Sequence, residues 1–167
     1  MYNQLTESDI KKMEAEIEHR KLVVRKAAIE AVKEARAQGD LSENFEYYAA
    51  KREKNQNESR IRYLERMIKT ARIVKDKTKE NEVGMNSLVD LYFEEDDCVE
   101  RYKIVTTVRG DTLGHKISIE SPLGKAIYGK KLNERIFVKV REDYGFYVVI
   151  QGIDKSEGDE QDQIRKY

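Results

Sequence analysis

The chain has 167 residues, enough for one or two domains, and its 32 basic and 32 acidic residues give a formal net charge of zero. Charged residues make up 38% and hydrophobic residues 39% of the sequence, which argues against a single large core. The single cysteine, Cys98, excludes an internal disulfide and indicates a reducing compartment. The sequence has no signal-peptide pattern and no apolar run approaching about 18 residues, so we expect a cytoplasmic protein with no membrane span.

The charge is divided unevenly along the chain. Residues 1–75 contain 17 Lys and Arg against 13 Asp and Glu, and residues 76–167 carry the opposite excess. A positive excess of this size permits contact with a polyanion without requiring it.

Residues 6–37 predict a long helix, because they contain no proline or glycine and repeat apolar residues mostly at steps of three and four. The repeating positions are Ile10, Met13, Ile17, Val24, Ala28, Val32 and Ala35. Thr6 is the expected N-cap with Asp9 closing a capping box, and Gly39 is a natural residue to end the helix.

A second helix is predicted after the turn at residues 39–44. Its apolar positions are Ile61, Leu64, Ile68 and Ala71, and the same seam traced back toward the turn passes through Asn57, Lys54, Ala50 and Tyr47. Helices joined by a short turn run antiparallel, so residues 1–76 predict a coiled-coil hairpin whose seam is more polar toward its tip. A helix of about 32 residues is roughly 48 Å long, and such a hairpin is too slender to enclose a catalytic cleft.

The predicted tip carries two carboxylates, Asp40 and Glu43. They could be the N-cap and N3 residues of a capping box for the second helix. They could also be metal ligands that the hairpin delivers to a site completed by another molecule, and the two roles are compatible because a capped carboxylate is held in place. Ser42 and Asn44 are expected to make local hydrogen bonds in the turn.

Basic residues decorate both helices, and most of them indicate a solvated surface with intrahelical pairs such as Glu58–Arg62. Lys51 and Arg52 are the exception, because they follow the two carboxylates by about two turns of helix. From there they could contact the phosphates of a nucleic-acid end held at the tip.

The second half of the chain predicts a small sheet domain over residues 83–153, after a linker at 77–82. Strands are predicted at residues 87–93, 98–105, 116–120, 135–140 and 146–150. Ser121 and Pro122 predict the start of a short helix over residues 123–128, and Gly129 ends it. The fold class is therefore α+β, a helical hairpin followed by an antiparallel or mixed sheet with one short helix, and we expect residues 154–167 to be disordered.

The sequence contains no catalytic constellation of its own. His19 and His115 are far apart and neither has a companion at metal-ligand spacing, and there is no glycine-rich phosphate loop. Cys98 is expected to be a half-buried strand residue and not a nucleophile.

Three segments carry a resemblance to a known family. They are Leu5-Thr6 before the first helix, residues 34–47 (EARAQGDLSENFEY) and residues 119–131 (IESPLGKAIYGKK). Across residues 5–153 the chain resembles the bacterial Gre transcription elongation factors, which promote transcript cleavage, and it resembles GreA more than GreB. The third segment is similar to the conserved part of their FKBP-like C-terminal domain.

The resemblance implies a partner and a borrowed active site. Gre factors bind backtracked RNA polymerase, dock their globular domain at the rim of its secondary channel and insert the coiled coil through that channel. The matching acids, Asp40 and Glu43, would stabilise a second Mg²⁺ beside the 3′ end of the nascent RNA, while the polymerase holds the first. The resemblance also implies a monomeric transcription regulator with DNA binding as an associated property. By itself, such a protein would not be an enzyme.

The same resemblance assigns polymerase docking to one short segment, which comprises Ser121, Pro122, Leu123, Gly124 and Lys125. Two departures from the family pattern stand out. Arg25-Lys26 replaces a frequent Arg-Pro, which should leave the first helix straighter, and Phe45 adds an exposed aromatic where the family usually has alanine.

Rival interpretations stay open. Some Gre homologues inhibit polymerase by filling the same channel, but they tend to carry more tip acids than Asp40, Glu43 and the nearby Glu46. A coiled-coil adaptor or an FKBP-like binding module is an alternative from a different class. A prolyl isomerase would need an aromatic pocket, which could not be assembled from Tyr128, Phe137, Tyr144 and Phe146, and a self-contained nuclease would need another acid cluster.

Overall fold

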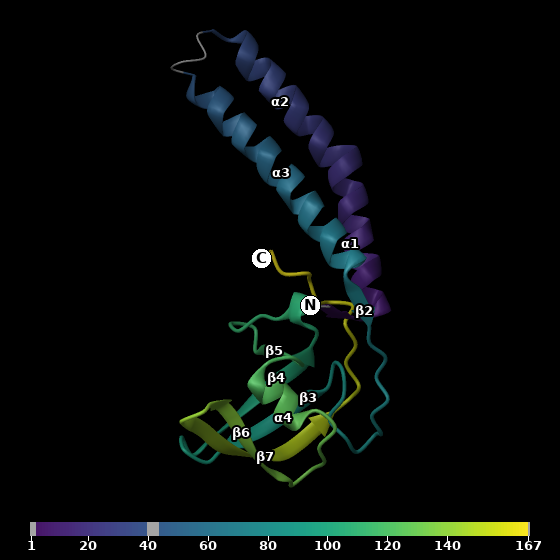
Figure 1. The fold of residues 1–167 in the computed structure, drawn as a ribbon, viewed down its shortest axis with the longest axis vertical. Coiled ribbons are helices and arrows are strands. Elements are labelled where there is room, and N and C mark those ends of the chain that lie inside the picture. Colours follow the sequence, from purple (N-terminus) through teal and green to yellow (C-terminus); the bar gives the residue numbers. More distant parts are fainter. Residues whose placement is uncertain (1–2, 40–43, 167) are drawn as a thin grey trace. The chain divides into compact units, whose positions relative to one another are not determined.

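The computed structural model describes residues 3–39 and 44–166, and the chain divides into two compact units (Figure 1). The first unit contains residues 9–71 together with residue 3, and the second contains residues 4–8 and the chain from residue 72 onward. One unit is a helical hairpin and the other is a small mixed sheet with one short helix, so the predicted α+β class is confirmed. No helix in the described ranges is long and apolar enough to cross a membrane.

The hairpin consists of α1 (Glu7–His19), the π-helical turn η1 (Arg20–Val24), α2 (Arg25–Ala37) and α3 (Phe45–Lys69). Figure 1 shows α2 and α3 side by side. Asn44 contacts Ala35 near the turn, whereas Asn57 contacts Arg20 farther along. Residues later in one helix thus meet residues earlier in the other, as antiparallel helices require.

The predicted seam positions between the helices are all buried or half-buried. Met13, Ala35, Tyr47, Ile61 and Leu64 are each at most 9% exposed. Asn57, nearer the turn than Ile61, is also buried. The polar position thus lies in the middle of the seam, and the prediction that the seam becomes steadily more polar toward the tip is wrong, because Ala35 and Tyr47 are buried nearer the turn.

The predicted first helix is present from residue 7 to residue 37, but it contains a π-helical turn that the sequence did not predict. At η1 the N–H of Arg25 bonds the carbonyl of Arg20, a spacing of five residues where an α-helix has four. The Arg20 carbonyl also accepts a 3.3 Å hydrogen bond from the Asn57 side chain, so a polar residue of α3 is bonded to the backbone at this turn. The interruption falls directly before Arg25-Lys26, where a straighter helix was expected.

The ends of the hairpin enter a short two-stranded sheet of β1 (Asn3–Leu5) and β2 (Ala71–Ile73). Ala71 is therefore a strand residue and not, as predicted, a seam position of the second helix. Strands of three residues are too short to leave a periodic pattern, which is why the sequence did not predict them.

The second unit contains a five-stranded sheet in the order β5-β4-β3-β7-β6. The strands are β3 (Leu88–Phe93), β4 (Cys98–Val105), β5 (Lys116–Ser118), β6 (Arg135–Arg141) and β7 (Tyr144–Asp154). β4 and β5 are parallel, and the other neighbours are antiparallel. All five predicted strands are present, β7 being longer than expected.

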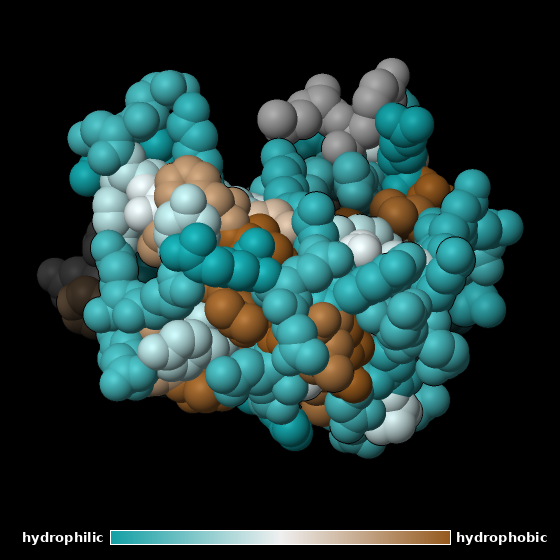
Figure 2. Space-filling view, turned by 90° about the horizontal axis from the view of Figure 1, so that it is seen from below, coloured by the Kyte–Doolittle hydropathy of each residue, from teal (hydrophilic) through white to brown (hydrophobic). Residues whose placement is uncertain are grey.

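The core lies on one face of this sheet. Val89, Leu91, Val148 and Ile150 are fully buried and form one cluster with Ile127 of α4 (Pro122–Ile127), the helix that lies across this face in Figure 1. Side chains alternate in burial along β6, where Phe137 is half exposed between buried neighbours. Seen from below, the surface is mainly hydrophilic with apolar residues gathered near its middle (Figure 2). One-sided coverage explains the alternating pattern that predicted the strands.

The prediction of a disordered tail is wrong for the described residues 155–166. Asp162 is 5% exposed, and the N–H of Arg165 donates to the carbonyl of Val108 at 2.7 Å. Three basic side chains of the sheet unit hold the Asp162 carboxylate, and such ion pairs between distant residues leave no trace in local composition.

The backbone around α4 approaches another segment closely. Ser121 caps the helix by accepting a hydrogen bond from the N–H of Gly124 at 3.0 Å, and its hydroxyl donates to the Ser118 carbonyl at 2.7 Å. A Cβ atom on Gly124 would lie 1.9 Å from that carbonyl oxygen. The glycine is thus required by packing alone.

We expect Gly124→Ala to lower the free energy of unfolding of the sheet unit by about 1–3 kcal/mol, because backbone must move to admit the methyl group. Urea unfolding followed by circular dichroism measures this loss. Gly158→Ala is the matched control, since its Cβ would meet nothing closer than 3.8 Å. Equal stability of the two variants would contradict the close approach.

Candidate functional site

The two carboxylates predicted at the hairpin tip, Asp40 and Glu43, lie outside the described residues. The structure describes the helix ends on either side of them. α2 ends at Ala37 and α3 begins at Phe45, so both acids belong to the connection between two paired helices.

Asn44 organises the start of α3. Its Oδ1 accepts a hydrogen bond from the N–H of Tyr47 at 3.0 Å, which makes it the N-cap of the helix. Its Nδ2 donates to the carbonyl of Ala35 at 2.6 Å, so one side chain caps α3 and ties it to α2. The prediction that Asn44 bonds locally is confirmed. The N-cap of α3 is Asn44, so the alternative of a capping box that begins at Asp40 is not the cap of this helix as the structure describes it.

Tyr47 continues this bridge between the helices. It is buried in the seam, and its hydroxyl accepts a 3.3 Å hydrogen bond from Nη2 of Arg36 on α2. This bond lowers the pKa of Tyr47 below its ordinary value. The Arg36 guanidinium lies 5.5 Å from the centre of the Tyr47 ring, within the range of a cation–π contact.

Lys51 and Arg52, the predicted nucleic-acid contacts, are exposed on α3. Lys51 lies 6.0 Å from the centre of the Tyr47 ring, which places its ammonium group beside the aromatic bridge. Phe45 is 85% exposed and Tyr48 is 50% exposed. The first two turns of α3 therefore present both aromatic and cationic side chains to solvent.

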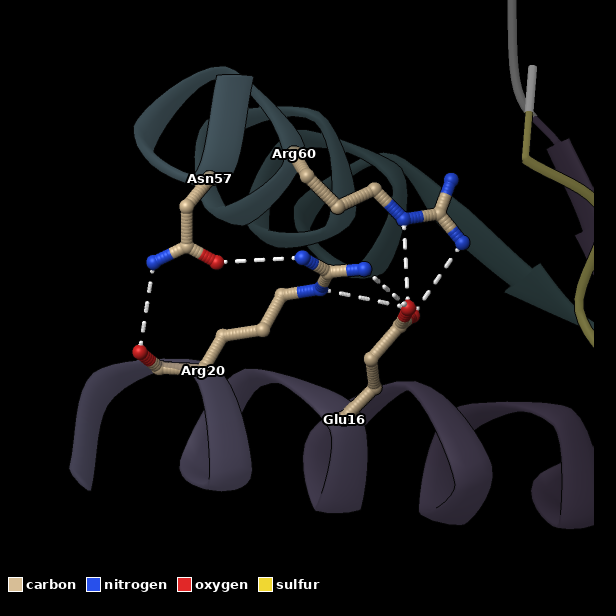
Figure 3. Close-up of polar contacts among 4 residues, drawn as sticks. All are labelled: Glu16, Arg20, Asn57 and Arg60. Carbon is tan, nitrogen blue, oxygen red and sulfur yellow. Dashed lines mark hydrogen bonds and ion pairs between the residues drawn. The ribbon is translucent and has the colours of Figure 1, made fainter. Parts of the chain in front are cut away.

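A polar network crosses the hairpin where an apolar seam would be expected (Figure 3). The Glu16 carboxylate accepts hydrogen bonds from Arg20 at 3.2 Å and from Arg60 at 3.1 Å. Arg20 also donates to Oδ1 of Asn57 at 3.0 Å. The signal that could have revealed this network is Asn57 itself, a polar residue at a predicted seam position.

A second cross-hairpin pair lies beside this network. Arg25 donates two hydrogen bonds to the Glu58 carboxylate, at 2.7 and 2.9 Å. The hydrogen bond to Arg25 holds the pKa of Glu58 below its ordinary value. Glu58 is thus hydrogen-bonded to the other helix, while the charge of Arg62, its predicted intrahelical partner, also contributes to lowering that pKa.

The segment predicted to dock on polymerase begins at the N-terminus of α4. Ser121 and Pro122 are the N-cap and the first helical residue, as predicted. Leu123 packs against the core, Gly124 is buried and Lys125 is exposed. Only part of this segment is available to a partner.

The sheet unit also has an aromatic recess of about 270 Å³. It is lined by Phe93, Cys98, Tyr102, Tyr144, Phe146 and Tyr147 together with Glu95, Asp96 and Glu100. Burial and the neighbouring acids raise the pKa of the Cys98 thiol, which is half-buried as predicted. Tyr144 and Phe146 thus do contribute to an aromatic pocket, contrary to the sequence-based expectation.

No group of three or more His, Cys, Asp or Glu side chains within residues 3–39 and 44–166 is arranged to hold a metal ion. His19 lies at the end of α1, and His115 stacks on Tyr102 in the sheet unit.

Comparison with known proteins identifies the class. Residues 3–73 match the family described as "Transcription elongation factor, N-terminal", and residues 77–151 match "Transcription elongation factor, GreA/GreB, C-term". The hairpin and the sheet unit are thus those of a transcription elongation factor. The chain belongs to the GreA/GreB family.

Two GreA proteins agree with this assignment. The chain is 43% identical to the transcription elongation factor GreA of Caldanaerobacter subterraneus subsp. tengcongensis over 81% of this chain and 87% of that protein. It is 40% identical to GreA of Bacillus subtilis over 81% and 86% of the two chains. Among solved structures, the GreA factor homolog Gfh1 of Thermus thermophilus is 22% identical, with a TM-score of 0.43 over 92% of this chain and 99% of that one.

We expect Glu16→Gln to lower the free energy of unfolding of the hairpin by about 1–3 kcal/mol, because the nearly buried Arg60 guanidinium loses its charged acceptor. Thermal and urea unfolding followed by helical circular dichroism measure the change. Glu18→Gln is the matched control, an exposed acid on the same helix. Identical stabilities would show that the network contributes nothing to the hairpin.

Proposed function

We propose that this protein binds RNA polymerase, passes its hairpin into the secondary channel and stimulates the polymerase's own Mg²⁺-dependent cleavage of backtracked RNA. The observation that carries the proposal is the position of Asp40 and Glu43, which lie in the short connection between α2 and α3. Membership of the GreA/GreB family and the resemblance of residues 34–47 to the family's tip segment support it.

The donor set at the connection suits a shared magnesium ion. Mg²⁺ in phosphoryl-transfer sites is held by one or two carboxylates and keeps several waters, so two acids are enough to hold it only when a partner supplies the rest. When bound, a second Mg²⁺ would supply the charge that stabilises the attacking or leaving oxygen of phosphodiester hydrolysis. In this proposal the chain supplies only part of the metal site, and the polymerase supplies the rest.

The contacts across the hairpin give this chain's residues a positioning role. Asn44 and Tyr47 tie the start of α3 to α2, and the Arg25–Glu58 pair repeats the connection farther along. A catalytic group must be held within about 0.5 Å of its working position by such supporting contacts. The paired helices therefore provide a stiff support for the acids.

The basic side chains would act on the nucleic acid. Lys51 and Arg52 are exposed on the first turns of α3, where they would neutralise phosphates near the RNA 3′ end. The exposed ring of Phe45 is available to stack on an unpaired base.

The globular unit would dock at the channel rim through the segment 121–125, of which Pro122 and Lys125 are the exposed members.

A rival function as an FKBP-like binding module is favoured by one observation, the aromatic recess of the sheet. Incubating a stalled elongation complex with the protein and Mg²⁺ separates the two. Shortened RNA 3′ ends support the proposal, blocked extension indicates a channel inhibitor, and an unchanged complex indicates a binding module.

We expect Asp40→Asn or Glu43→Gln to reduce cleavage of backtracked RNA by roughly 100-fold while polymerase binding is retained, because each removes a charged ligand. Gel analysis of labelled RNA gives the cleavage rate, and co-sedimentation with polymerase gives binding. Glu53→Gln, an exposed acid farther along α3, should cleave as the unaltered protein does. Undiminished cleavage in both tip variants would contradict the proposed role of the two acids as metal ligands.

We expect Lys51→Glu to weaken engagement of backtracked RNA more than binding to polymerase without RNA. Each lost phosphate contact should reduce the slope of log affinity against log salt by about 0.7. Titrations at several salt concentrations measure the slope, and Lys11→Glu on α1 is the charge-matched control. Equal weakening with and without RNA would argue against a phosphate contact.

A further inference from the structure

The tail carboxylate of Asp162 is held by three cations of the sheet unit. It lies 2.8 Å from Nη1 of Arg109, 3.0 Å from Nζ of Lys103 and 2.9 Å from Nζ of Lys116. The side chain of Asp162 is 2% exposed. A carboxylate is removed from water at this depth only where charged partners replace its hydration.

The cations form a site that is itself largely buried. The side chain of Arg109 is fully buried, that of Lys103 is 5% exposed and that of Lys116 is 26% exposed. Arg109 is oriented by a 2.7 Å hydrogen bond to Oδ1 of Asn86. Burial by itself would raise the pKa of Asp162, but the hydrogen bonds from the three cations outweigh it and hold that pKa below its ordinary value.

The same site also binds peptide backbone. Nζ of Lys103 donates to the carbonyl of Gly158 at 2.6 Å, and the N–H of Arg165 donates to the carbonyl of Val108 at 2.7 Å. Contacts on both sides of Asp162 are therefore to main-chain atoms. A free phosphate could replace the carboxylate but not these contacts, so the geometry favours a peptide ligand.

The three cations lie in the part of the chain that matches the family, and their carboxylate ligand does not. Lys103, Arg109 and Lys116 lie within residues 77–151, which match the GreA/GreB C-terminal domain, whereas Asp162 lies beyond that match. The carboxylate thus reaches the site from an extension of the domain.

We propose that Lys103, Arg109 and Lys116 form a binding site for an acidic peptide segment, and that residues 155–166 occupy it as an intramolecular ligand. A tethered ligand acts at an effective concentration near the millimolar range, so an acidic segment of a partner must compete with the tail. The site does not depend on the role of the hairpin.

The test uses the full chain and a labelled peptide with the sequence of residues 155–166, KSEGDEQDQIRK. Fluorescence anisotropy should show that Asp162→Asn protein binds the peptide at least tenfold more tightly than the unaltered protein, because its own tail no longer competes. Glu157→Gln, which alters an exposed tail acid, should bind as the unaltered protein does. Equal binding by the unaltered and Asp162→Asn proteins would overturn the proposal.

Two further experiments test which chemical group the site recognises. A peptide carrying asparagine in place of Asp162, added to Asp162→Asn protein, should bind at least tenfold more weakly than the acidic peptide, and equal binding would exclude recognition of the acid. Millimolar inorganic phosphate should leave the acidic peptide bound. Displacement by phosphate would overturn the assignment to a peptide in favour of a general oxyanion site.

Hydrogen exchange keeps the proposal testable if Asp162→Asn fails to fold. In the unaltered protein the Arg165 amide should be protected, and Lys116→Met, which removes the most exposed of the three cations, should speed its exchange at least tenfold. An unprotected Arg165 amide in the unaltered protein would show that the tail does not occupy the site.

Discussion

The pairing of α3 with the first helical segment is the constraint on which the hairpin depends. The two paired helices bury only a narrow apolar seam. In the middle of that seam, charged and amide side chains make the contacts between them. Glu16 joins Arg20 to Arg60, and Asn57 bonds both the side chain and the carbonyl of Arg20. Because these bonds are directional, they fix the register of one helix against the other more sharply than apolar contact could.

The π-helical turn follows from the same constraint. Its wider spacing begins at Arg20, whose carbonyl is shared between the Arg25 amide and the Asn57 side chain. A single polar residue on α3 is therefore bonded to the first helix where its hydrogen-bond pattern changes. Nearer the turn, Asn44 and the Arg36–Tyr47 contact provide further connections, so the two helix ends that flank Asp40 and Glu43 are tied together by hydrogen bonds.

The sheet unit has three distinct features: the core beneath α4, the aromatic recess and the cationic site around Asp162. One face carries the core beneath α4, and the beginning of α4 is shaped by the approach of Gly124 to the Ser118 carbonyl. The aromatic recess and the cationic site around Asp162 are separate features with opposite charge, acidic in one and basic in the other. The three cations lie within residues 77–151, which match the GreA/GreB C-terminal domain, and the carboxylate that they hold lies beyond that match.

Local sequence determined the helices, the five larger strands and the cap at Ser121, because each depends on neighbouring residues: a repeat of three and four, an alternation of two, or a short cap. It also placed Met13, Ile61 and Leu64 in the seam. Only the tertiary structure decided that Asn44 caps α3, that Glu58 pairs with Arg25 and that Asp162 is buried among Lys103, Arg109 and Lys116. The pairs formed by Glu58 and Asp162 join residues more than thirty positions apart, and a charged side chain has the same local signature whether its partner lies in solvent or on a distant strand.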